Sequence, residues 1–360
     1  MLRVVSLFSG AGGLDIGFER TGYFQSLACF DSDKDCVETL TTNRHLGRSS
    51  NRHTFLREAI VATADLGQPR LALKSLCSKP VDVVIGGPPC QAFSVLGKRR
   101  GTDDARGSLV FSYLSAVELL GSRAFVLENV PGFASIEQGG TFSAVLERAR
   151  ALGYECWFGK LCAADYGDPT IRTRFFLVGV RDPTFPLCVP PVTHHAGRSD
   201  PDPSNIPDLL AEYQIASALK PYRTVSDALL GIDDPELNVQ NLNAHIAVRH
   251  QVSTIERFRL LQPGERDVAR RRNRLRLDAP ALTLFSGGIK GKKQARTHIH
   301  PIFPRELTPR ECARLHSFPD YWEFSGATDS VLTQVSNSVP IELGSAVGRM
   351  VARACGEIPS

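Results

Sequence analysis

A short apolar run that ends in two glycines and two prolines constrains the fold of this chain more than any other stretch. Residues 81–85 read Val-Asp-Val-Val-Ile, and Gly-Gly-Pro-Pro-Cys-Gln follows directly. The β-branched residues predict a buried strand, and the prolines end it because each lacks an N–H donor and restricts the residue before it. Cys90 therefore follows the carboxyl end of a strand, where open α/β sheets bind ligands. This position favours a nucleophilic thiol over the alternative, a merely buried cysteine.

A strand followed by a glycine-rich turn opens the chain. Residues 3–8 are apolar, residues 9–15 read Ser-Gly-Ala-Gly-Gly-Leu-Asp, and a helical pattern begins near Ile16. Glycine lets the backbone approach a ligand and a helix end offers free N–H groups, so the unit predicts a nucleotide-type cofactor site. Asp15 replaces the third glycine of the dinucleotide fingerprint and disfavours phosphate. The turn therefore favours a positively charged cofactor over NAD, and the alternative is a plain turn in which Asp15 caps the helix.

The next predicted strand, residues 27–30, ends in an acidic cluster. An acid in the position of Asp31, at the end of the second strand of such a unit, typically holds ribose hydroxyls. The alternative is that Asp31 or Asp33 only caps the helix that follows. Beyond that helix the pattern is weaker, and it predicts a third strand near 54–56 and a helix near 70–76.

Charged side chains also mark two later strands. Residues 124–127 are apolar and lead into Glu128, whose carboxyl group is a candidate for a raised pKa and hence an acid at neutral pH. The alternative for Glu128 is a helix cap or a solvated loop acid. Arg172 and Arg174 alternate along the start of a strand, so we expect both on one face, where they can bind an anion or a carbonyl group.

The tail of the chain resumes regular structure after a long irregular region. Thr308, with proline next and Glu311 three residues later, predicts a helix start with a capping box. Further predicted elements are strands over 155–161 and 174–180 and helices over 108–120, 142–152 and 341–355.

The composition is that of an ordinary globular protein. The 360 residues are 42% hydrophobic and 22% charged, which is enough for a sizeable core and two lobes. Nine irregularly spaced cysteines argue against a disulfide framework, and no pair has zinc-ligand spacing, so no metal is expected. No apolar run has transmembrane length, and the amino terminus does not resemble a signal peptide. These features predict a reduced, soluble, cytoplasmic protein without a membrane partner, and we expect a monomer.

The α/β alternation stops near residue 182, where a stretch rich in Pro, His, Ser and Asp begins. We therefore predict one domain formed by residues 1–185 together with 328–360, and a second domain over 186–327.

Basic residues concentrate locally, although the net charge of +4 is too small to prove a polyanionic partner. The concentrations lie in residues 98–107, 266–276 and 287–296. Basic loops that contain glycine fit contact with a phosphate backbone, and the first of them can also act as a lid. The alternative for each is a solvated surface segment.

Taken in chain order, these motifs resemble those of the DNA (cytosine-5) methyltransferases. Residues 8–13 are similar to the family's S-adenosylmethionine loop, 87–91 to its catalytic Pro-Cys-Gln loop and 128–130 to its Glu-Asn-Val motif. Residues 305–320 and 334–340 resemble its ninth and tenth motifs. The shared order and spacing of Pro-Cys-Gln, Glu-Asn-Val and Asn-Ser-Val-Pro make the resemblance specific.

The resemblance implies a Rossmann-like S-adenosylmethionine-dependent methyltransferase fold, with a mostly parallel, doubly wound sheet and a smaller, irregular target recognition domain. It implies methyl transfer from S-adenosylmethionine, without a metal, to carbon 5 of a flipped-out cytosine in a specific double-stranded DNA sequence. It further implies a bacterial restriction-modification or orphan methylase, whose restriction endonuclease would act on the same site without a stable complex. The alternatives are cytosine-5 methylation of RNA, such as transfer RNA, and a non-catalytic DNA-binding regulator on the same fold.

The resemblance also assigns roles to residues. Cys90 is the nucleophile that adds to cytosine C6, and Glu128 protonates or hydrogen-bonds N3. Arg172 holds cytosine O2 and the Glu128 carboxyl group, and Arg174 lies near a phosphate or the catalytic loop. The cofactor would contact Phe8, Ser9, Gly10, Ala11, Gly12, Gly13, Leu14, Asp31, Ser32, Gly87, Pro89, Asn337 and Ser338. The residues assigned to DNA are Gln91, Ser94, Lys98, Arg99, Arg106, Arg270, Arg271, Arg272, Lys290, Lys292 and Lys293.

Three positions depart from the family pattern. Thr170 replaces the glutamine of the eighth motif, and Ser32 stands where an aromatic residue usually stacks on adenine. Ala59, with Glu58 beside it, aligns with the acid that usually contacts adenine N6.

Overall fold

The computed structural model describes most of the chain, namely residues 1–49, 55–67, 73, 80–89, 109–196, 219–269, 271–286 and 295–358. Several predicted site residues lie outside the described residues: Cys90, Gln91, Ser94, Lys98, Arg99, Arg106, Arg270, Lys290, Lys292 and Lys293. The helix predicted near residues 70–76 lies almost wholly outside them too.

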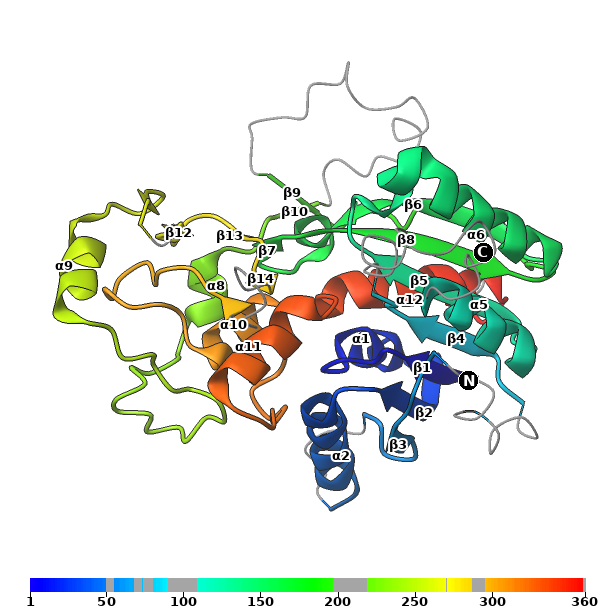
Figure 1. Ribbon diagram of the computed structural model, residues 1–360, viewed down its shortest axis with the longest axis horizontal. Helices are drawn as coiled ribbons and strands as arrows, with labels where there is room; N and C mark the ends of the chain where they lie inside the picture. Colours follow the sequence, from blue (N-terminus) through cyan, green and yellow to red (C-terminus); the bar gives the residue numbers. More distant parts are fainter. Residues whose placement is uncertain are drawn as a thin grey trace, which may run out of the picture.

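One central sheet of seven strands carries the larger lobe (Figure 1), in the order β3-β2-β1-β4-β5-β8-β6. The strands are β1 (Leu2–Leu7), β2 (Phe24–Asp31), β3 (Ile60–Thr63), β4 (Val83–Gly86), β5 (Ala124–Asn129), β6 (Glu155–Cys162) and β8 (Thr173–Val180). The first five run parallel, while β8 is antiparallel to both β5 and β6. The predicted mostly parallel sheet is confirmed, and its geometry brings the carboxyl ends of β1, β2, β4 and β5 to one edge.

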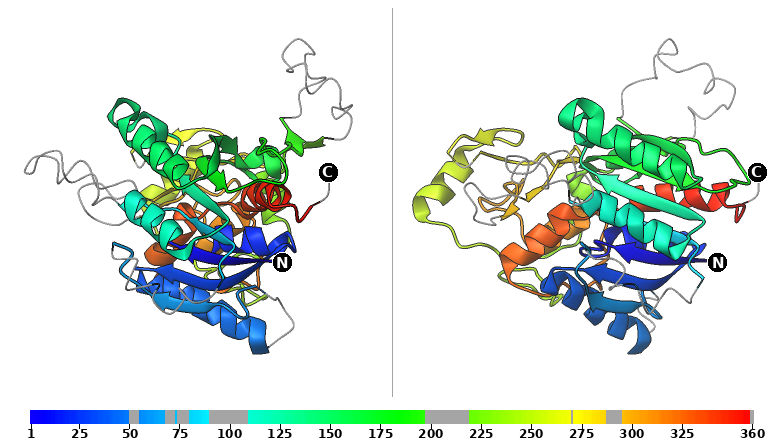
Figure 2. Two further views of the ribbon diagram at one scale, coloured as in Figure 1. Left: turned by 90° about the vertical axis from the view of Figure 1, so that its right-hand side faces the viewer. Right: turned by 45° about the vertical axis from the view of Figure 1, so that its right-hand side comes forward.

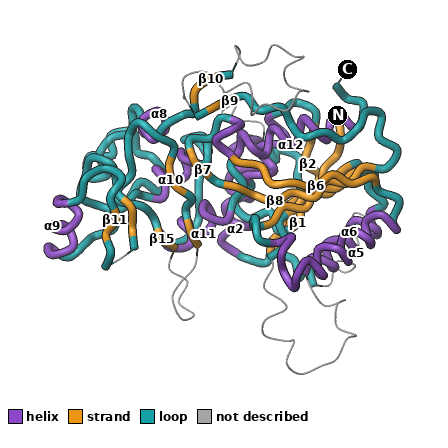
Figure 3. Tube along the Cα trace, turned by 90° about the horizontal axis from the view of Figure 1, so that it is seen from above, coloured by secondary structure: helices purple, strands orange, loops and turns teal. Residues whose placement is uncertain are grey.

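Helices cover both faces of this sheet (Figure 3). They are α1 (Gly13–Arg20), α2 (Lys34–Ser49), α5 (Leu109–Leu120), α6 (Gly140–Ala151) and α12 (Ile341–Ala354), with 3-10 turns η3 (Phe133–Gly139) and η4 (Ala163–Tyr166). Apolar side chains of α1 and α12 form a core with one face, and those of α5 and α6 with the other. The crossing of α1 and α12 is so close that a Cβ atom on Gly17 would lie 2.8 Å from the backbone of Gly344.

The smaller lobe consists of short elements joined by loops (Figures 1 and 2). Its described helices are α8 (Val225–Leu229), α9 (Val252–Leu260) and α10 (Pro309–Leu315), and α11 (Thr328–Asn337) follows and leads into α12 of the larger lobe. Two-residue strands form four small ladders: β7 (Thr170–Ile171) with β13 (Ala281–Leu282), β9 (His194–His195) with β10 (Lys220–Pro221), β11 (Arg266–Asp267) with β12 (Arg272–Asn273), and β14 (Phe285–Ser286) with β15 (Ala295–Arg296). Among the described residues of this lobe no sheet has more than two strands, and β7, directly before β8, joins the lobe to the larger sheet.

One apolar cluster joins the two lobes. It contains Ile16 and Leu40 from the helices beside the sheet, and Leu284, Leu307 and Trp322 from the later part of the chain. This continuous core fixes the smaller lobe relative to the edge of the sheet.

Most predicted elements are confirmed, including the capping box, in which Thr308 and Glu311 exchange hydrogen bonds at the start of α10. The strand predicted near 54–56 is wrong. Leu56 has a φ of +56° and a buried side chain inside a turn, and the third strand is β3, at Ile60–Thr63. A single buried apolar side chain in a turn gives the same local pattern as a strand. Within the described residues no helix is long and apolar enough to cross a membrane.

Candidate cofactor and substrate site

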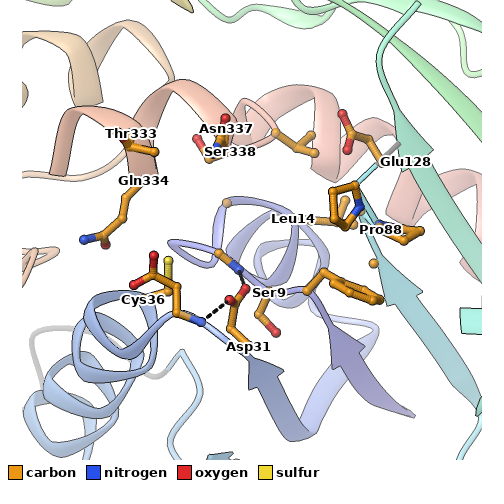
Figure 4. A pocket seen from close by; sticks show the side chains of 18 of the residues that line it. Ser9, Leu14, Asp31, Cys36, Pro88, Glu128, Thr333, Gln334, Asn337 and Ser338 are labelled. Atoms are coloured by element: carbon orange, nitrogen blue, oxygen red, sulfur yellow. Dashed lines mark hydrogen bonds between the residues drawn. The ribbon is translucent and has the colours of Figure 1, made fainter. Parts of the chain in front are cut away.

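A cavity of about 800 Å³ lies at the carboxyl edge of the sheet, between the start of α1 and helix α11 (Figure 4). It brings together Glu128, Arg174 and most of the residues predicted to bind the cofactor. Those are Phe8, Ser9, Gly10, Gly13, Leu14, Asp31, Ser32, Gly87, Pro89, Asn337 and Ser338. Two segments more than 300 residues apart thus share one cavity, as expected for a site at the carboxyl ends of parallel strands.

The glycine turn wraps around the carboxyl group of Asp31. The N–H of Gly10 donates to Asp31 Oδ2 over 2.8 Å, and Gly10 has a φ of +55°, which favours glycine. The N–H of Asp33 donates to the other carboxylate oxygen over 2.9 Å. Burial raises the pKa of Asp31, while these backbone N–H groups oppose that shift. Asp31 faces the cavity with its carboxylate held in one orientation, and the carboxylate can accept further hydrogen bonds from hydroxyl groups.

The helix cap proposed as an alternative role for Asp31 belongs to its neighbour. Asp33 precedes α2, and its Oδ1 accepts the N–H of Asp35 over 2.9 Å. This is the usual contact of an N-cap carboxylate with the first turn.

Two residues of the predicted cofactor loop do not line the cavity. Ala11 is fully buried in the apolar cluster between the lobes. Gly12 has a φ of +84°, and a Cβ atom there would lie 2.9 Å from Leu40, so this glycine is needed for the entry into α1. These contacts give Ala11 and Gly12 a packing role, and their contact with the cofactor stays a prediction.

Asp15 is not a helix cap, because α1 begins after Gly12 without a side-chain cap. Its carboxyl group is fully buried, and it accepts the thiol of Cys29 over 3.3 Å. Burial raises the pKa of Asp15 to about 6. Because Asp15 also lines the cavity, it adds negative charge near neutral pH, in keeping with a cationic cofactor.

Glu128 forms an ion pair with Arg174 at the other end of the cavity. The distance between Glu128 Oε1 and Arg174 Nε is 2.9 Å, and each side chain is 11% exposed. Burial raises the pKa of Glu128, and the positive charges of Arg174 and Arg172 oppose that shift. The Glu128 carboxyl group therefore lies next to a positive charge that favours its ionised form, while its burial favours the protonated form.

The start of the predicted catalytic loop packs directly on Glu128. A Cβ atom at Gly87 would lie 2.7 Å from Glu128 Oε2, so any side chain there would displace the Glu128 carboxyl group. The side chain of Asn129 donates to the carbonyl group of Pro88 over 3.1 Å, which fixes the two prolines beside β5. Cys90 itself lies outside the described residues, but it follows Pro89, which lines the cavity together with Glu128.

Arg172 does not have the predicted contact with Glu128. It lies between β7 and β8, is fully buried, and its Nη1 donates to the carbonyl group of Leu284 over 3.1 Å. Its Nη2 donates to the carbonyl group of Ser336. The alternation of Arg172 and Arg174 predicts that both lie on one face. Backbone carbonyl groups bind Arg172, and among the described residues the ion pair of Glu128 is with Arg174.

Arg272 is not available to DNA in the predicted way. Its Nε lies 2.6 Å from Glu306 Oε1, and the two side chains are only 12% and 8% exposed. Arg271, by contrast, is exposed at the turn between β11 and β12, with a φ of +54°. Within the basic run 266–276, Arg272 therefore stabilises the smaller lobe, while Arg271 faces solvent.

These two neighbours provide a matched pair of variants. We expect Arg272→Ala to lower the free energy of unfolding by about 1.5–3 kcal/mol, because the buried Glu306 carboxyl group loses its charged hydrogen bond to the Arg272 guanidinium. We expect Arg271→Ala to leave unfolding unchanged. Urea denaturation of both variants checks this, and equal midpoints would show that the Arg272–Glu306 pair contributes nothing to stability.

Sequence reasoning missed several cavity residues. Thr333 and Gln334 project from α11, and Asn129 and Val130 follow Glu128 (Figure 4 shows the first two). The i, i+4 spacing of Thr333 and Asn337 on one helix face was a usable signal.

The acid that follows the third strand is Asp65, two residues after β3, and not a residue beside Ala59. Asp65 accepts the N–H of Gly67 and does not line the cavity. Ala59 is fully buried and precedes β3. Among the described residues, no group of three His, Cys, Asp or Glu side chains could hold a metal ion.

Comparison with known proteins gives consistent matches over the whole chain. A family model described as C-5 cytosine-specific DNA methylase matches residues 2–353. The type II methyltransferase M.XorII of Xanthomonas oryzae pv. oryzae is 31% identical, covering 99% of this chain and 85% of its own length. M.PspPI of a Psychrobacter species is 30% identical, with 99% and 80% covered.

Solved structures share the fold. A protein described as a DNA modification methyltransferase encoded within an Escherichia coli prophage superposes with a TM-score of 0.74 at 24% identity, covering 99% of this chain and all of that one. The Dnmt2 methyltransferase of S. pombe superposes with a TM-score of 0.61 at 16% identity, covering 97% of this chain and 98% of its own. At these identities the likeness concerns the fold alone.

Proposed function

We propose a reaction and a set of residue roles from one premise: the chain belongs to the C-5 cytosine-specific DNA methylase family. It is a DNA cytosine-5 methyltransferase, and membership of the family implies S-adenosylmethionine as the methyl donor. The observation that carries the residue roles is the Glu128–Arg174 pair beside the Gly87–Pro89 turn, at one end of a cavity whose other end holds Asp31.

We place the cofactor between the glycine turn and α11. Asp31 would accept the ribose hydroxyls, and the N–H groups at the start of α1 would face the methionine part together with Asn337 and Ser338. When bound, the cofactor supplies an electrophilic methyl group. The acidic cavity, with Asp15 and Asp31, suits its positive charge.

We place the target cytosine between Glu128 and the catalytic loop. Cytosine C5 becomes nucleophilic once a thiolate adds to C6, and we assign that addition to Cys90. Protonated Glu128 would donate to N3 as electrons enter the ring. Arg174, which pairs with Glu128, is better placed than Arg172 to hold cytosine O2, so we assign that role to Arg174. After transfer, a base removes the C5 proton and the Cys90–C6 bond breaks.

The division of the chain follows from these roles. We propose that residues 1–185 and 328–360 form the catalytic domain, and that residues 186–327 recognise the double-stranded target. The target base lies inside the duplex, so the base must be flipped into the cavity. Since the relatives are named type II methyltransferases, we propose that the chain protects DNA from an endonuclease that reads the same sequence.

Transfer of a labelled methyl group tests the proposed function. We expect incorporation from S-adenosylmethionine into duplex DNA of random sequence and none into RNA. Bisulfite sequencing of that DNA will then identify the target sequence. Label in transfer RNA but not in DNA would overturn the DNA assignment, and no label in either would favour a regulatory protein on this fold.

Asp31 gives a test of the cofactor position. We expect Asp31→Ala to raise the dissociation constant for S-adenosylmethionine by about 10- to 100-fold, because hydrogen bonds to a charged group contribute roughly 1.5–3 kcal/mol. Calorimetric titration measures this, with duplex affinity as a second readout that should not change.

Asp33→Ala is the matched control, because it removes a neighbouring carboxylate that caps α2. It should cost about 1 kcal/mol of stability and leave cofactor affinity much closer to the wild type. Equal loss of cofactor affinity in both variants would remove the specific role of Asp31.

Arg271 gives a test of target recognition. Arginine can bind a guanine edge through two hydrogen bonds, and such contacts contribute about 1–3 kcal/mol of discrimination. We therefore expect Arg271→Ala to relax sequence choice at one base position while leaving the methylation rate at the preferred sequence nearly intact. Bisulfite sequencing of random DNA treated with the variant checks this, and an unchanged sequence preference would exclude Arg271 from recognition.

A further inference from the structure

A single buried guanidinium joins the recognition part of the chain to the helix that lines the cofactor cavity. Arg172 is fully buried, and it donates to the carbonyl group of Leu284 and to that of Ser336. Leu284 directly precedes β14, the first strand of the β14–β15 hairpin. Ser336 directly precedes Asn337 and Ser338, which line the cavity. The two acceptors therefore belong to the two halves of the proposed reaction, recognition and methyl transfer.

Other contacts tie the same junction together. Strands β7 and β13 pair in parallel, with Thr170 opposite Ala281. The hydroxyl group of Thr170 donates to the carbonyl group of Ala281 over 3.2 Å, and that of Thr283 donates to the carbonyl group of Ile171 over 2.7 Å. The hairpin also packs against α11. A displacement of the hairpin must therefore move α11 with it or break buried hydrogen bonds.

The cavity end of this junction is equally well ordered. The hydroxyl group of Ser338 contacts His316 Nδ1 over 3.1 Å and donates to the carbonyl group of Val335. Burial lowers the pKa of His316 well below its usual value, and the charges of Arg172 and Arg174 act in the same direction. Because the His316 imidazole is then neutral, the positive charge at this junction comes from Arg172 and Arg174.

We propose that Arg172 is a positioning residue that couples DNA binding to cofactor binding. DNA that contacts the hairpin favours the arrangement in which Leu284 and Ser336 are both bound by Arg172. That arrangement holds Asn337 and Ser338 against the cofactor, so each ligand raises the affinity for the other. Because coupling of two binding equilibria is reciprocal, cofactor must strengthen DNA binding by the same factor. The inference rests on the proposed function, since it needs both ligands to bind.

Lysine cannot replace this guanidinium, because a single ammonium group lacks the planar fork that reaches two carbonyl groups at once. Arg172→Lys keeps the positive charge but cannot bind both carbonyl groups. The variant therefore separates the effect of the two hydrogen bonds from the effect of the charge. The matched control is Arg310→Lys. Arg310 is also fully buried and donates to the carbonyl groups of Asn243, Pro319 and Trp322, none of which lines the cavity.

Calorimetry with S-adenosylhomocysteine, free and in the presence of a saturating duplex that carries the sequence found by bisulfite sequencing, tests the coupling. We expect the duplex to tighten binding to the wild type by at least about 5-fold, a typical coupling factor, and the titration of duplex into enzyme with bound S-adenosylhomocysteine to give the same factor. Arg172→Lys should reduce the factor to about 1, and Arg310→Lys should keep the wild-type factor.

Three results would overturn the inference: no coupling in the wild type, full coupling in Arg172→Lys, or equal loss in Arg310→Lys, which would indicate general destabilisation. If circular dichroism shows that Arg172→Lys is unfolded, Thr170→Val replaces it, because it removes one hydrogen bond of the same junction without changing side-chain size. Full coupling in that variant would equally overturn the inference. Failure of the wild type to bind either ligand would instead count against the proposed function.

Discussion

Cys90→Ala is expected to abolish methyl transfer, with a loss of at least about 10⁴-fold, while the variant still binds S-adenosylmethionine and duplex DNA. Removal of a covalent nucleophile usually costs this much, because the remaining groups can only bind and orient the substrate. The cavity that Pro89 lines also holds Glu128, the acid that we propose to act together with Cys90. Single-turnover transfer of labelled methyl groups measures the loss.

A trapping experiment separates the nucleophile from other roles of Cys90. Duplex DNA with 5-fluorocytosine at the target should form a covalent complex with the wild type, because fluorine does not leave as a proton does. Cys90→Ala should form none. Cys188→Ala is the control, since Cys188 is exposed and should affect neither transfer nor trapping. Methylation by Cys90→Ala at more than a few per cent of the wild-type rate would disprove the assignment.

The part of the site that follows from strand ends was predictable from the sequence. Asp31, Glu128 and the Gly87–Pro89 turn each follow a short apolar run, and parallel strands bring such ends to one edge by geometry alone. The same reasoning located the glycine turn that binds Asp31. It could not separate the cavity residues of that turn from Ala11 and Gly12, because burial between two lobes depends on packing partners far away in the chain.

The roles of arginines were much less predictable. Arg172 is occupied by carbonyl groups of Leu284 and Ser336, more than 110 residues later in the chain, and Arg272 by Glu306. A basic residue has the same local pattern whether it binds phosphate or stabilises the interior. Only the three-dimensional structure distinguishes Arg271, which is exposed, from Arg272, which is half-buried and paired with Glu306.

Glu128→Gln is expected to lower single-turnover methylation by about 10²- to 10⁴-fold, the usual contribution of a general acid. Glutamine keeps the shape of the side chain and a hydrogen-bond donor but cannot transfer a proton to cytosine N3. Burial raises the pKa of Glu128, and the cations Arg174 and Arg172 oppose that shift. The protonated form therefore competes with the ionised form that pairs with Arg174. Cofactor and duplex affinities should change little, because the loss concerns the transition state.

The pH dependence of this step has a definite sign. Only the protonated carboxyl group can donate to N3, so the contribution of Glu128 to the wild-type rate should fall as the pH rises through its raised pKa. Thiolate formation at Cys90 has the opposite dependence, and the product of the two gives a bell-shaped profile. In Glu128→Gln the alkaline decline should disappear, while the acid limb that reports the thiol stays.

Glu118→Gln is the matched control, because Glu118 also pairs with an arginine, Arg148, but on the surface, with 48% of its side chain exposed. Exposed ion pairs contribute at most about 1 kcal/mol to stability, and this one touches no cavity residue. We expect Glu118→Gln to keep the wild-type rate and both limbs of the profile. An alkaline limb that survives in Glu128→Gln would assign that limb to another group, and an unchanged rate would remove Glu128 from proton transfer while leaving Cys90 as the nucleophile.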